Sequence, residues 1–322
     1  MSDARQTSTL VLETVTGPVV GSKVRSALCH EHFFVDFSGP TSPAYMDVNW
    51  ADVTGACVNN ANELRTLGVD LVIDWTNLGV GRNVLLLREI SRRTGIKIAC
   101  PTGIYKSLVP PHLAKHSVDD LARHFYSELV GGIDGTPIRA GWVKAATTEN
   151  GPTKAETSIH RAAARAATQA GAAIGLHSPD ARAARFVVKT LEQEGFDVSR
   201  FVWAHAQLSD TADHLAMATR GAMVQFDAIG TAEDTMFHGP TDDESMLDRI
   251  QAMVEAGFGS SVLVSADATV VANPAKAQYA RDNTYVLRVF APKLRQRIGS
   301  AAARLLLRDN VIKTFRRGTS VR

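Results

Sequence analysis

Two histidines separated by one residue, His30 and His32, end an apolar stretch of the sequence. In a β-strand, residues i and i+2 lie on the same face, so both imidazoles can point one way while Glu31 points the other way. Neutral imidazoles on a rigid strand are good ligands for zinc or a similar divalent metal. A histidine pair alone is equally well explained by packing or by exposure to solvent. It becomes a candidate metal site only if further ligands converge on it.

Three later polar residues each end an apolar run: His177 in Gly-Leu-His-Ser, His205 in Trp-Ala-His-Ala and Asp267 in Ser-Ala-Asp. In a (β/α)₈ barrel, the residues at the carboxyl ends of the strands face the active site. Burial of so many polar groups without a partner would cost several kcal/mol. A metal would supply that partner, so these positions predict a metal site built by several strands.

Lys144 lies in the apolar segment Gly-Trp-Val-Lys-Ala-Ala and is expected to face the interior of a barrel. A buried ammonium is costly unless it is paired or neutralised. One interpretation is an ion pair with a carboxylate such as Asp267. The other is a lysine converted to a carbamate, whose negative charge would bridge two metals.

The elements that must position these residues alternate between strand and helix patterns. The expected strands are 24–32, 69–75, 96–104, 140–146, 172–177, 201–206, 222–227 and 261–267. Helical periodicity is expected at 83–93, 153–170, 180–194, 211–219, 243–256, 282–298 and 301–314. The first turn of the segment 153–170 carries a capping box, and Gly171 follows its end.

Eight strand–helix alternations without a linker predict an α/β fold of the (β/α)₈ or TIM-barrel type. We expect one domain over residues 1–322, with the barrel at about 24–299 and a C-terminal helix at about 301–316. The segment that precedes the first strand is expected to form a short N-terminal β-hairpin across the bottom of the barrel. The rival fold, an open doubly wound sheet, is disfavoured because no Gly-x-Gly-x-x-Gly follows the first strand.

The composition excludes few classes of protein, but it indicates which partners and which location to expect. The chain of 322 residues carries a net charge of +2 with dispersed basic residues, so no nucleic-acid partner is expected. No apolar run approaches the ~20 residues needed to span a bilayer, and the polar N-terminus does not resemble a secretory signal. Three cysteines without Cys-x-x-Cys spacing predict no disulfide framework. We therefore expect a cytoplasmic protein that acts on a small molecule and does not associate with membranes.

Several segments together resemble the phosphotriesterase family of the amidohydrolase superfamily, which includes the phosphotriesterase-like lactonases. The similarity covers about residues 12–316 and is most specific around Lys144. The matching segments are TVTGP near the start, HEH at 30–32, DWTNLGVGRN at 74–83, PTGIY at 101–105, IRAGWVKAATT at 138–148, LHS at 176–178, AHA around His205 and SAD at 265–267.

The resemblance implies a binuclear metal centre and a homodimer. By this resemblance His30, His32 and Asp267 bind the more buried metal, and His177 and His205 bind the more exposed one. A carboxylated Lys144 and a hydroxide bridge the two metals. Zinc is the first expectation, with manganese, cobalt and iron as alternatives. Lys144 and Asp267 are the predicted catalytic residues, because Asp267 is placed to accept a proton from the hydroxide.

The sequence departs from this family around the substrate. Ala228 stands where relatives carry His or Arg after strand seven, and the acid that usually follows the strand-six histidine is absent until Asp210. The loops 229–240 and 268–280 are fairly apolar, which favours a neutral, partly hydrophobic substrate. The residues that we expect at the substrate are Tyr105, Trp75, Phe34, Asp227 and His238.

Hydrolysis of a lactone, carboxylic ester or amide is the leading hypothesis. Cleavage of organophosphate triesters is the alternative within the hydrolases. From other classes, we consider metal-dependent decarboxylation and a non-catalytic binding protein with a decayed site. The histidines that lie in helical or loop patterns are expected at the surface: His112, His116, His124, His160 and His214.

Overall fold

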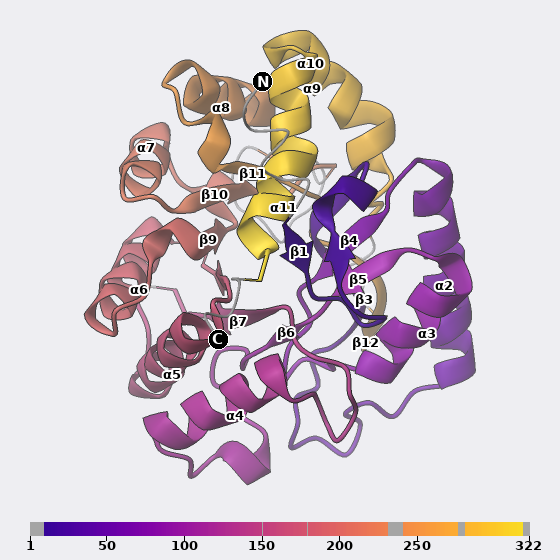
Figure 1. Ribbon diagram of the computed structural model, residues 1–322, viewed down its shortest axis with the longest axis vertical. Helices are drawn as coiled ribbons and strands as arrows, with labels where there is room; N and C mark the ends of the chain where they lie inside the picture. Colours follow the sequence, from indigo (N-terminus) through magenta and orange to yellow (C-terminus); the bar gives the residue numbers. More distant parts are fainter. Residues whose placement is uncertain (1–9, 150, 179, 231–240, 276–280, 318–322) are drawn as a thin grey trace.

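The computed structural model describes residues 10–149, 151–178, 180–230, 241–275 and 281–317. Its centre is a ring of parallel strands surrounded by helices (Figure 1). The strands of the ring, in chain order, are β3 (Ala27–Asp36), β4 (Leu71–Asp74), β5 (Lys97–Ala99), β6 (Pro101–Thr102), β7 (Trp142–Ala146), β8 (Ile174–His177), β9 (Phe201–Ala204), β10 (Met223–Phe226), β11 (Val262–Val264) and β12 (Ala268–Asn273).

Two of the eight barrel strands are interrupted, and these interruptions divide the ring into two hydrogen-bonded runs. The first lies at Cys100, between β5 and β6, where the Cys100 carbonyl accepts a hydrogen bond from Gly141 N at 2.9 Å. The second lies between β11 and β12, where Asp267 N donates to the carbonyl of His30 at 3.0 Å. Neighbouring strands are thus bonded across both breaks. The predicted (β/α)₈ barrel is confirmed, with all eight strands at the expected places.

The outer helices cover the barrel wall with their apolar faces. They are α2 (Trp50–Thr66), α3 (Val84–Thr94), α4 (Val118–Val130), α5 (Lys154–Ala170), α6 (Ala181–Gln193), α7 (Thr211–Thr219), α8 (Asp243–Glu255) and α9 (Ala291–Ile298), the last preceded by a π-helical turn at Val286–Phe290. In α5, Thr153 and Glu156 form the expected capping box, and Gly171 ends the helix at φ 60°. Helices α2 and α4 were not predicted from the sequence, although Ser117 and Asp120 form a capping box at the start of α4.

The bottom of the barrel is closed by both ends of the described chain. The predicted hairpin is present as β1 (Val11–Leu12) and β2 (Val19–Val20), which pair antiparallel. The C-terminal helix is continuous through α10 (Ser300–Arg304), a π-helical turn (Leu305–Asp309) and α11 (Asn310–Phe315). Figure 1 shows α11 and β1 over the centre of the ring. Leu12 and Phe315 belong to one buried cluster with Trp75 and Trp142 from inside the barrel.

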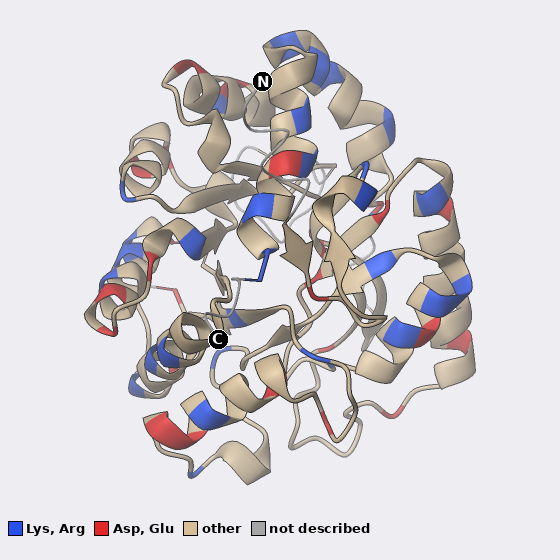
Figure 2. Ribbon diagram, in the orientation of Figure 1, with Lys and Arg blue, Asp and Glu red and all other residues tan. Residues whose placement is uncertain are grey.

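Figure 2 shows acidic and basic residues interspersed over the outer helices. Within the described ranges, no helix combines the length and the apolar character that a membrane crossing requires. The three cysteines, Cys29, Cys57 and Cys100, are buried free thiols.

Candidate metal centre

One cavity of about 260 Å³ lies at the carboxyl ends of the barrel strands. It brings together seven residues that the sequence pointed to: His30, His32, Tyr105, Lys144, His177, His205 and Asp267. The other residues that line it are Val35, Phe37, Val80, Thr269 and Arg281. All six expected metal ligands therefore converge on one site, from β3, β7 and β8 and from the residues that follow β9 and β11.

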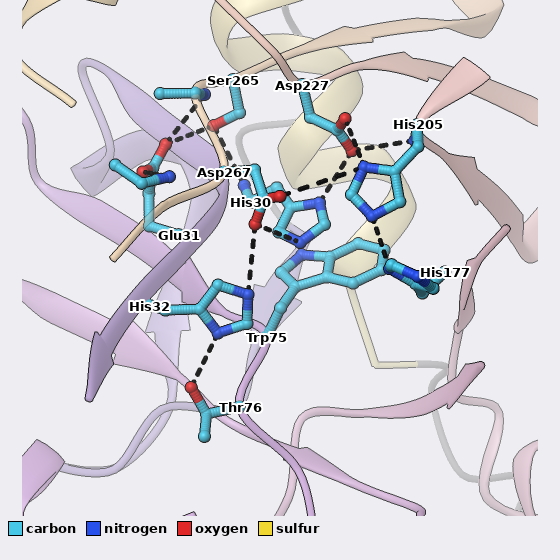
Figure 3. Close-up of polar contacts among 12 residues, drawn as sticks. His30, Glu31, His32, Trp75, Thr76, His177, His205, Asp227, Ser265 and Asp267 are labelled. Carbon is cyan, nitrogen blue, oxygen red and sulfur yellow. Dashed lines mark hydrogen bonds and ion pairs between the residues drawn. The ribbon is translucent and has the colours of Figure 1, made fainter. Parts of the chain in front are cut away.

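Two imidazoles and one carboxylate meet on the side of the cavity nearest β3. The Nε2 atoms of His30 and His32 lie 3.3 and 3.2 Å from the same oxygen, Oδ1 of Asp267 (Figure 3). Both histidines are at most 8 % exposed. Alternation along β3 thus places both rings on the inner face as expected.

The other two histidines meet on the opposite side of the cavity. His177 Nδ1 and His205 Nε2 are 2.6 Å apart, and the Tyr105 hydroxyl lies 3.3 Å from His177 Nε2. The backbones of His205 and Asp267 turn into the left-handed region, at φ 63° and φ 52°. Such conformations are costly for non-glycine residues and persist at functional sites where the surroundings enforce them.

Asp227 supports both halves of the cluster from behind. Its fully buried carboxylate lies 2.9 Å from His30 Nδ1 and 2.8 Å from His205 Nδ1. The side-chain amides of Gln207 and Gln225 donate to the same carboxylate at 3.1 and 2.9 Å. A carboxylate that receives the Nδ1 proton of a histidine fixes its tautomer and directs Nε2 to a metal.

His30, His205 and Asp227 also offer donor atoms within 4.8 Å of one another. We do not place a metal among them, because the atoms that Asp227 contacts are the Nδ1 atoms and the amides of Gln207 and Gln225 surround its oxygens. The sequence-based expectation of substrate contact by Asp227 is therefore replaced by a supporting position below the cavity.

Thr76 has the corresponding position for His32. Its Oγ1 donates to the carbonyl of Phe34 at 3.1 Å and lies 2.8 Å from His32 Nδ1, so it accepts the Nδ1 proton. Trp75 supports His30 by stacking, with ring centroids 3.9 Å apart and an angle of 16° between the planes. Both His30 and His32 are thus held in one orientation, and their Nδ1 atoms each face a hydrogen-bond acceptor.

The protonation of the cluster fits a bound cation. Burial lowers the pKa of His30 and of His32 to about 4, so both rings are neutral at neutral pH. With Nδ1 protonated toward Asp227 and Thr76, both Nε2 atoms direct lone pairs at the Asp267 carboxylate. Three such acceptors facing one another are unfavourable without a cation between them. Imidazole nitrogens and a carboxylate are the ligands that zinc and related metals take.

Lys144 is the least conventional member of the site. It is 2 % exposed, and its Nζ lies 5.3 Å from the ring centre of Trp75 and 5.4 Å from that of Tyr105. Within the described residues it forms no ion pair with Asp267 or another carboxylate. Burial lowers the pKa of the ammonium to about 8, although Asp267 and Asp74 oppose the shift. The interpretation of Lys144 as one half of an ion pair therefore finds no carboxylate partner among the described residues.

Glu31 points away from the cavity, as expected, and holds the loop that carries Asp267. Its carboxylate accepts hydrogen bonds from Ser265 Oγ at 2.7 Å, Ala266 N at 3.2 Å and Ala268 N at 3.0 Å. Ser265 Oγ in turn accepts from His30 N at 3.0 Å. Strand β3, which carries His30 and His32, and the segment that carries Asp267 are thereby fixed to each other.

Some expected substrate residues lie elsewhere. Trp75 is fully buried beneath His30, and its Nε1 donates to the Cys29 carbonyl at 2.6 Å. Phe34 packs outward against Trp50, with ring centroids 5.0 Å apart. His30 and His32 face the cavity, but the next inward residue of β3 is Val35 and not Phe34. Strict alternation is lost here because the pairing of β3 with β4 has ended, and Phe33 N donates instead to Asp74 Oδ2 at 3.0 Å. His238 lies outside the described residues.

The expectation of surface histidines is wrong for two helices. His160 and His214 are fully buried, and their Nε2 atoms lie 3.0 Å from the Ala146 carbonyl and 2.6 Å from the Ala206 carbonyl. His124 is partly buried, while His112 and His116 are exposed. Asp210, the first acid after His205, caps α7 by accepting from Asp213 N at 2.8 Å.

Sequence reasoning assigned no role to Thr76, Arg281 or the lining residues Val35 and Val80, whereas Phe37, expected near the mouth, does line the cavity. Asp227 ends an apolar strand just as His205 does, so its closeness to the site was visible in the sequence but its contacts were not. Arg281 gave no signal, because it follows a long loop and precedes a helix.

A (β/α)₈ barrel with histidines, an aspartate and a lysine at its strand ends defines a class of metal-dependent hydrolases. The particular family follows from comparison: the model of the phosphotriesterase family matches residues 10–315, and the chain belongs to this family. Members are binuclear metal enzymes, and the His/Asp groups described above could hold metal.

The relatives agree with this assignment. The chain is 33% identical over 293 residues to the phosphotriesterase homology protein of Escherichia coli, covering 89% of this chain and 97% of that protein. It is 28% identical to the N-acetyltaurine hydrolase of Danio rerio over 63% of this chain and 60% of that protein.

Solved structures extend the similarity to the whole fold. An organophosphorus hydrolase mutant from Deinococcus radiodurans superposes with a TM-score of 0.85 at 26% identity, covering 96% of this chain and 98% of that one. An organophosphate hydrolase engineered from a weak promiscuous lactonase also gives a TM-score of 0.85 at 26% identity, covering 95% of this chain and 100% of that one. The protein is a metal-dependent hydrolase that acts on a small molecule.

Proposed function

We propose that this hydrolase binds two divalent metals and cleaves a lactone, a carboxylic ester or an amide. One observation carries the proposal: four imidazoles, a carboxylate and a lysine line one cavity, with His30 and His32 at the carboxylate and His177 paired with His205. His30, His32 and Asp267 would hold the more buried metal, and His177 and His205 the more exposed one. Zinc is the first expectation for this ligand set, with manganese, cobalt or iron as alternatives.

Lys144 would bridge the two metals as its N6-carbamate. A partly neutral amine can add to carbon dioxide: a nitrogen–carbon bond forms, the amine proton passes to solvent, and a carboxylate remains. The burial that lowers the pKa of Lys144 to about 8 raises the neutral fraction available for this reaction. The product replaces an unpaired buried cation by an anion, which two metals would stabilise.

When bound, the metals supply a nucleophilic hydroxide at neutral pH and polarise the substrate oxygen. Asp267 faces the cavity and would take the proton released when the water-derived oxygen bonds to the acyl carbon. It would then give this proton to the departing oxygen or nitrogen as the acyl bond breaks. Ala228 offers no imidazole for a longer relay, so the proton would pass directly from Asp267 to the leaving group.

The relatives support acyl substrates and leave a second candidate. The lactonase template and the N-acetyltaurine hydrolase point to cyclic esters and to amides. Organophosphate triesters are the second candidate, supported by the organophosphorus hydrolase of Deinococcus radiodurans. Ala228 in place of a polar residue after strand seven argues against specialisation for them.

The central test is Lys144→Ala in the metal-loaded protein. We expect the metal content to fall from two equivalents per chain, and turnover to fall by more than about 10³-fold because several kcal/mol of charge stabilisation is lost. Elemental analysis and proton release measure these effects. Lys189→Ala, at an exposed lysine on α6, is the matched control. Full activity of Lys144→Ala would overturn the bridging role.

A substrate panel separates the bond types. Lactones, esters, amides and phosphotriesters are assayed by proton release, with carbon dioxide release recorded in parallel to detect a decarboxylase. Faster metal uptake by the apoprotein in added bicarbonate would support the carbamate. The homodimer and the cytoplasmic location stay predictions, which sedimentation and cell fractionation would check.

A further inference from the structure

Arg281 brings a positive charge to the wall of the metal cavity. Its side chain is 5 % exposed, and its Nη1 donates to the Asp267 carbonyl at 2.9 Å and to Asp267 Oδ2 at 3.2 Å. It follows residues 268–280, which were expected to form a substrate-binding loop and of which Ala268–Asn273 instead form strand β12. A guanidinium therefore lies directly beside the Asp267 carboxylate on the cavity wall.

This guanidinium cannot replace an imidazole in proton transfer. Arginine stays protonated throughout the working range of proteins, so Arg281 neither accepts nor releases the proton of the reaction. What it offers the cavity is a permanent charge and a planar set of donors, which matches a carboxylate or another oxyanion. The attraction depends on the charge of Arg281 and holds whatever other bonds the side chain makes.

A second cation lies at the rim, on the side of Tyr105. Lys106 is partly buried and adopts φ 47°, and its Nζ is 5.6 Å from the centre of the Tyr105 ring. Its charge contributes to the lowered pKa of both Lys144 and His177, so its field reaches the cavity. Among the described residues that line the cavity, Asp267 is the only acid.

Apart from Thr269, the remaining wall is apolar. Val35, Phe37 and Val80 face the same space, whose volume of about 260 Å³ suits only a small molecule. A ligand that matches this lining has a short apolar part and one anionic group. A neutral substrate, which the loop composition favours, would gain no ionic attraction from Arg281.

We propose, on the basis of the hydrolase function above, that Arg281 is a specificity-determining residue that binds a carboxylate carried by the substrate near its scissile bond, with Lys106 adding attraction at the rim. The substrate class is therefore a small acyl compound with an anionic group, such as an N-acylated amino acid or the lactone or ester of a dicarboxylic acid. Sulfonates share the chemistry and form a second arm of the test.

The experiment compares matched pairs in the metal-loaded enzyme. N-acetyl-β-alanine is paired with its primary amide, and N-acetyltaurine with its sulfonamide. The binding of butyrate and of 1-butanol is measured by calorimetry. We expect wild-type protein to prefer the anionic member, and Arg281→Met to lower this preference about 10- to 100-fold, the range for loss of a charge-assisted hydrogen bond. Arg281→Lys should retain part of it, and Lys106→Met should lower it less.

Arg288→Met is the matched control, because Arg288 is an exposed arginine paired with Glu63 at 2.8 Å. Metal content is measured for each variant, and the charged-to-neutral ratio is compared, so a general disturbance of Asp267 affects both members equally. No anionic preference in wild type, or a preference unchanged in Arg281→Met, would overturn the assignment. Absence of all turnover with two metals bound would instead refute the hydrolase proposal, while the butyrate arm would still decide the role of Arg281.

Discussion

Two groups of buried histidines lie in neighbouring layers of this barrel. They differ in the partners of their two ring nitrogens. His30 and His205, at the cavity, have Nδ1 bound to Asp227 and direct Nε2 toward other ligands. His160 and His214, on α5 and α7, use Nε2 to reach the carbonyls of Ala146 at the end of β7 and of Ala206 in the turn after β9. Their Nδ1 atoms are buried without a hydrogen-bond partner in the described part of the chain.

Burial therefore does not distinguish a metal ligand from a packing residue. It lowers the pKa of His30 and of His160 alike to about 4. The distinction is in the partners: in the cavity group each Nε2 faces another potential metal ligand, whereas in the helix group each ring faces a single carbonyl. The helix group still serves the site indirectly, because Ala146 and Ala206 lie next to the ends of the strands that carry Lys144 and His205.

Asp227→Asn is expected to have the largest effect on the cavity histidines and therefore tests the difference between the two groups most directly. The carboxylate receives an Nδ1 proton from one histidine of each proposed metal position, so its loss should weaken both metals, by about 10- to 100-fold. Titration with a competing chelator measures the two affinities. Asp210→Asn, at the cap of α7, should leave them unchanged. Wild-type affinities in Asp227→Asn would show that its hydrogen bonds do not orient the ligands.

Thr76→Val should have a smaller and one-sided effect. Thr76 contacts only His32 among the four cavity histidines, so about a tenfold loss is expected at one metal, while the other is retained. Chelator-induced release should then become biphasic. The control is Thr190→Val, whose buried hydroxyl donates to the Phe186 carbonyl at 3.1 Å within α6. An equal loss of both metals would contradict the separate support of the two positions.

His160→Gln tests the helix group through pH. The unfolded chain binds a proton at His160 below about pH 6.5, but the folded protein does so only near its pKa of about 4. The unfolded state therefore binds more protons in between, and stability is lost as the pH falls from about 6.5 to 4.

The variant, which keeps a donor for Ala146, should remove up to about 1.4 kcal/mol per pH unit of that dependence. Urea unfolding at pH 7 and pH 5 measures it, with exposed His116→Gln as the control. Metal content should stay at the wild-type value. A wild-type pH slope in His160→Gln, or loss of metal at neutral pH, would place His160 outside the packing group.

Much of the fold and the core of the candidate site could be predicted from the sequence, because both depend on local periodicity. The eight apolar segments gave the barrel, and strand alternation placed His30 and His32 on one face. The residues that end the strands, His177, His205 and Asp267, could then be assigned to one rim. Phe34, which was expected at the substrate, packs outward instead, because the parity of β3 changes once its ladder with β4 has ended.

What the sequence determined by itself was the set of chemical groups at the strand ends. Only the tertiary structure decided which partner each group meets, because hydrogen bonds such as those of Asp227 join residues almost 200 positions apart. Helical periodicity marks the inner face of α5, but it does not reveal the strand carbonyl that His160 meets there. Likewise, Arg281 carries no local signal, and only the folded path of the chain brings its charge back to Asp267, 14 residues earlier in the sequence.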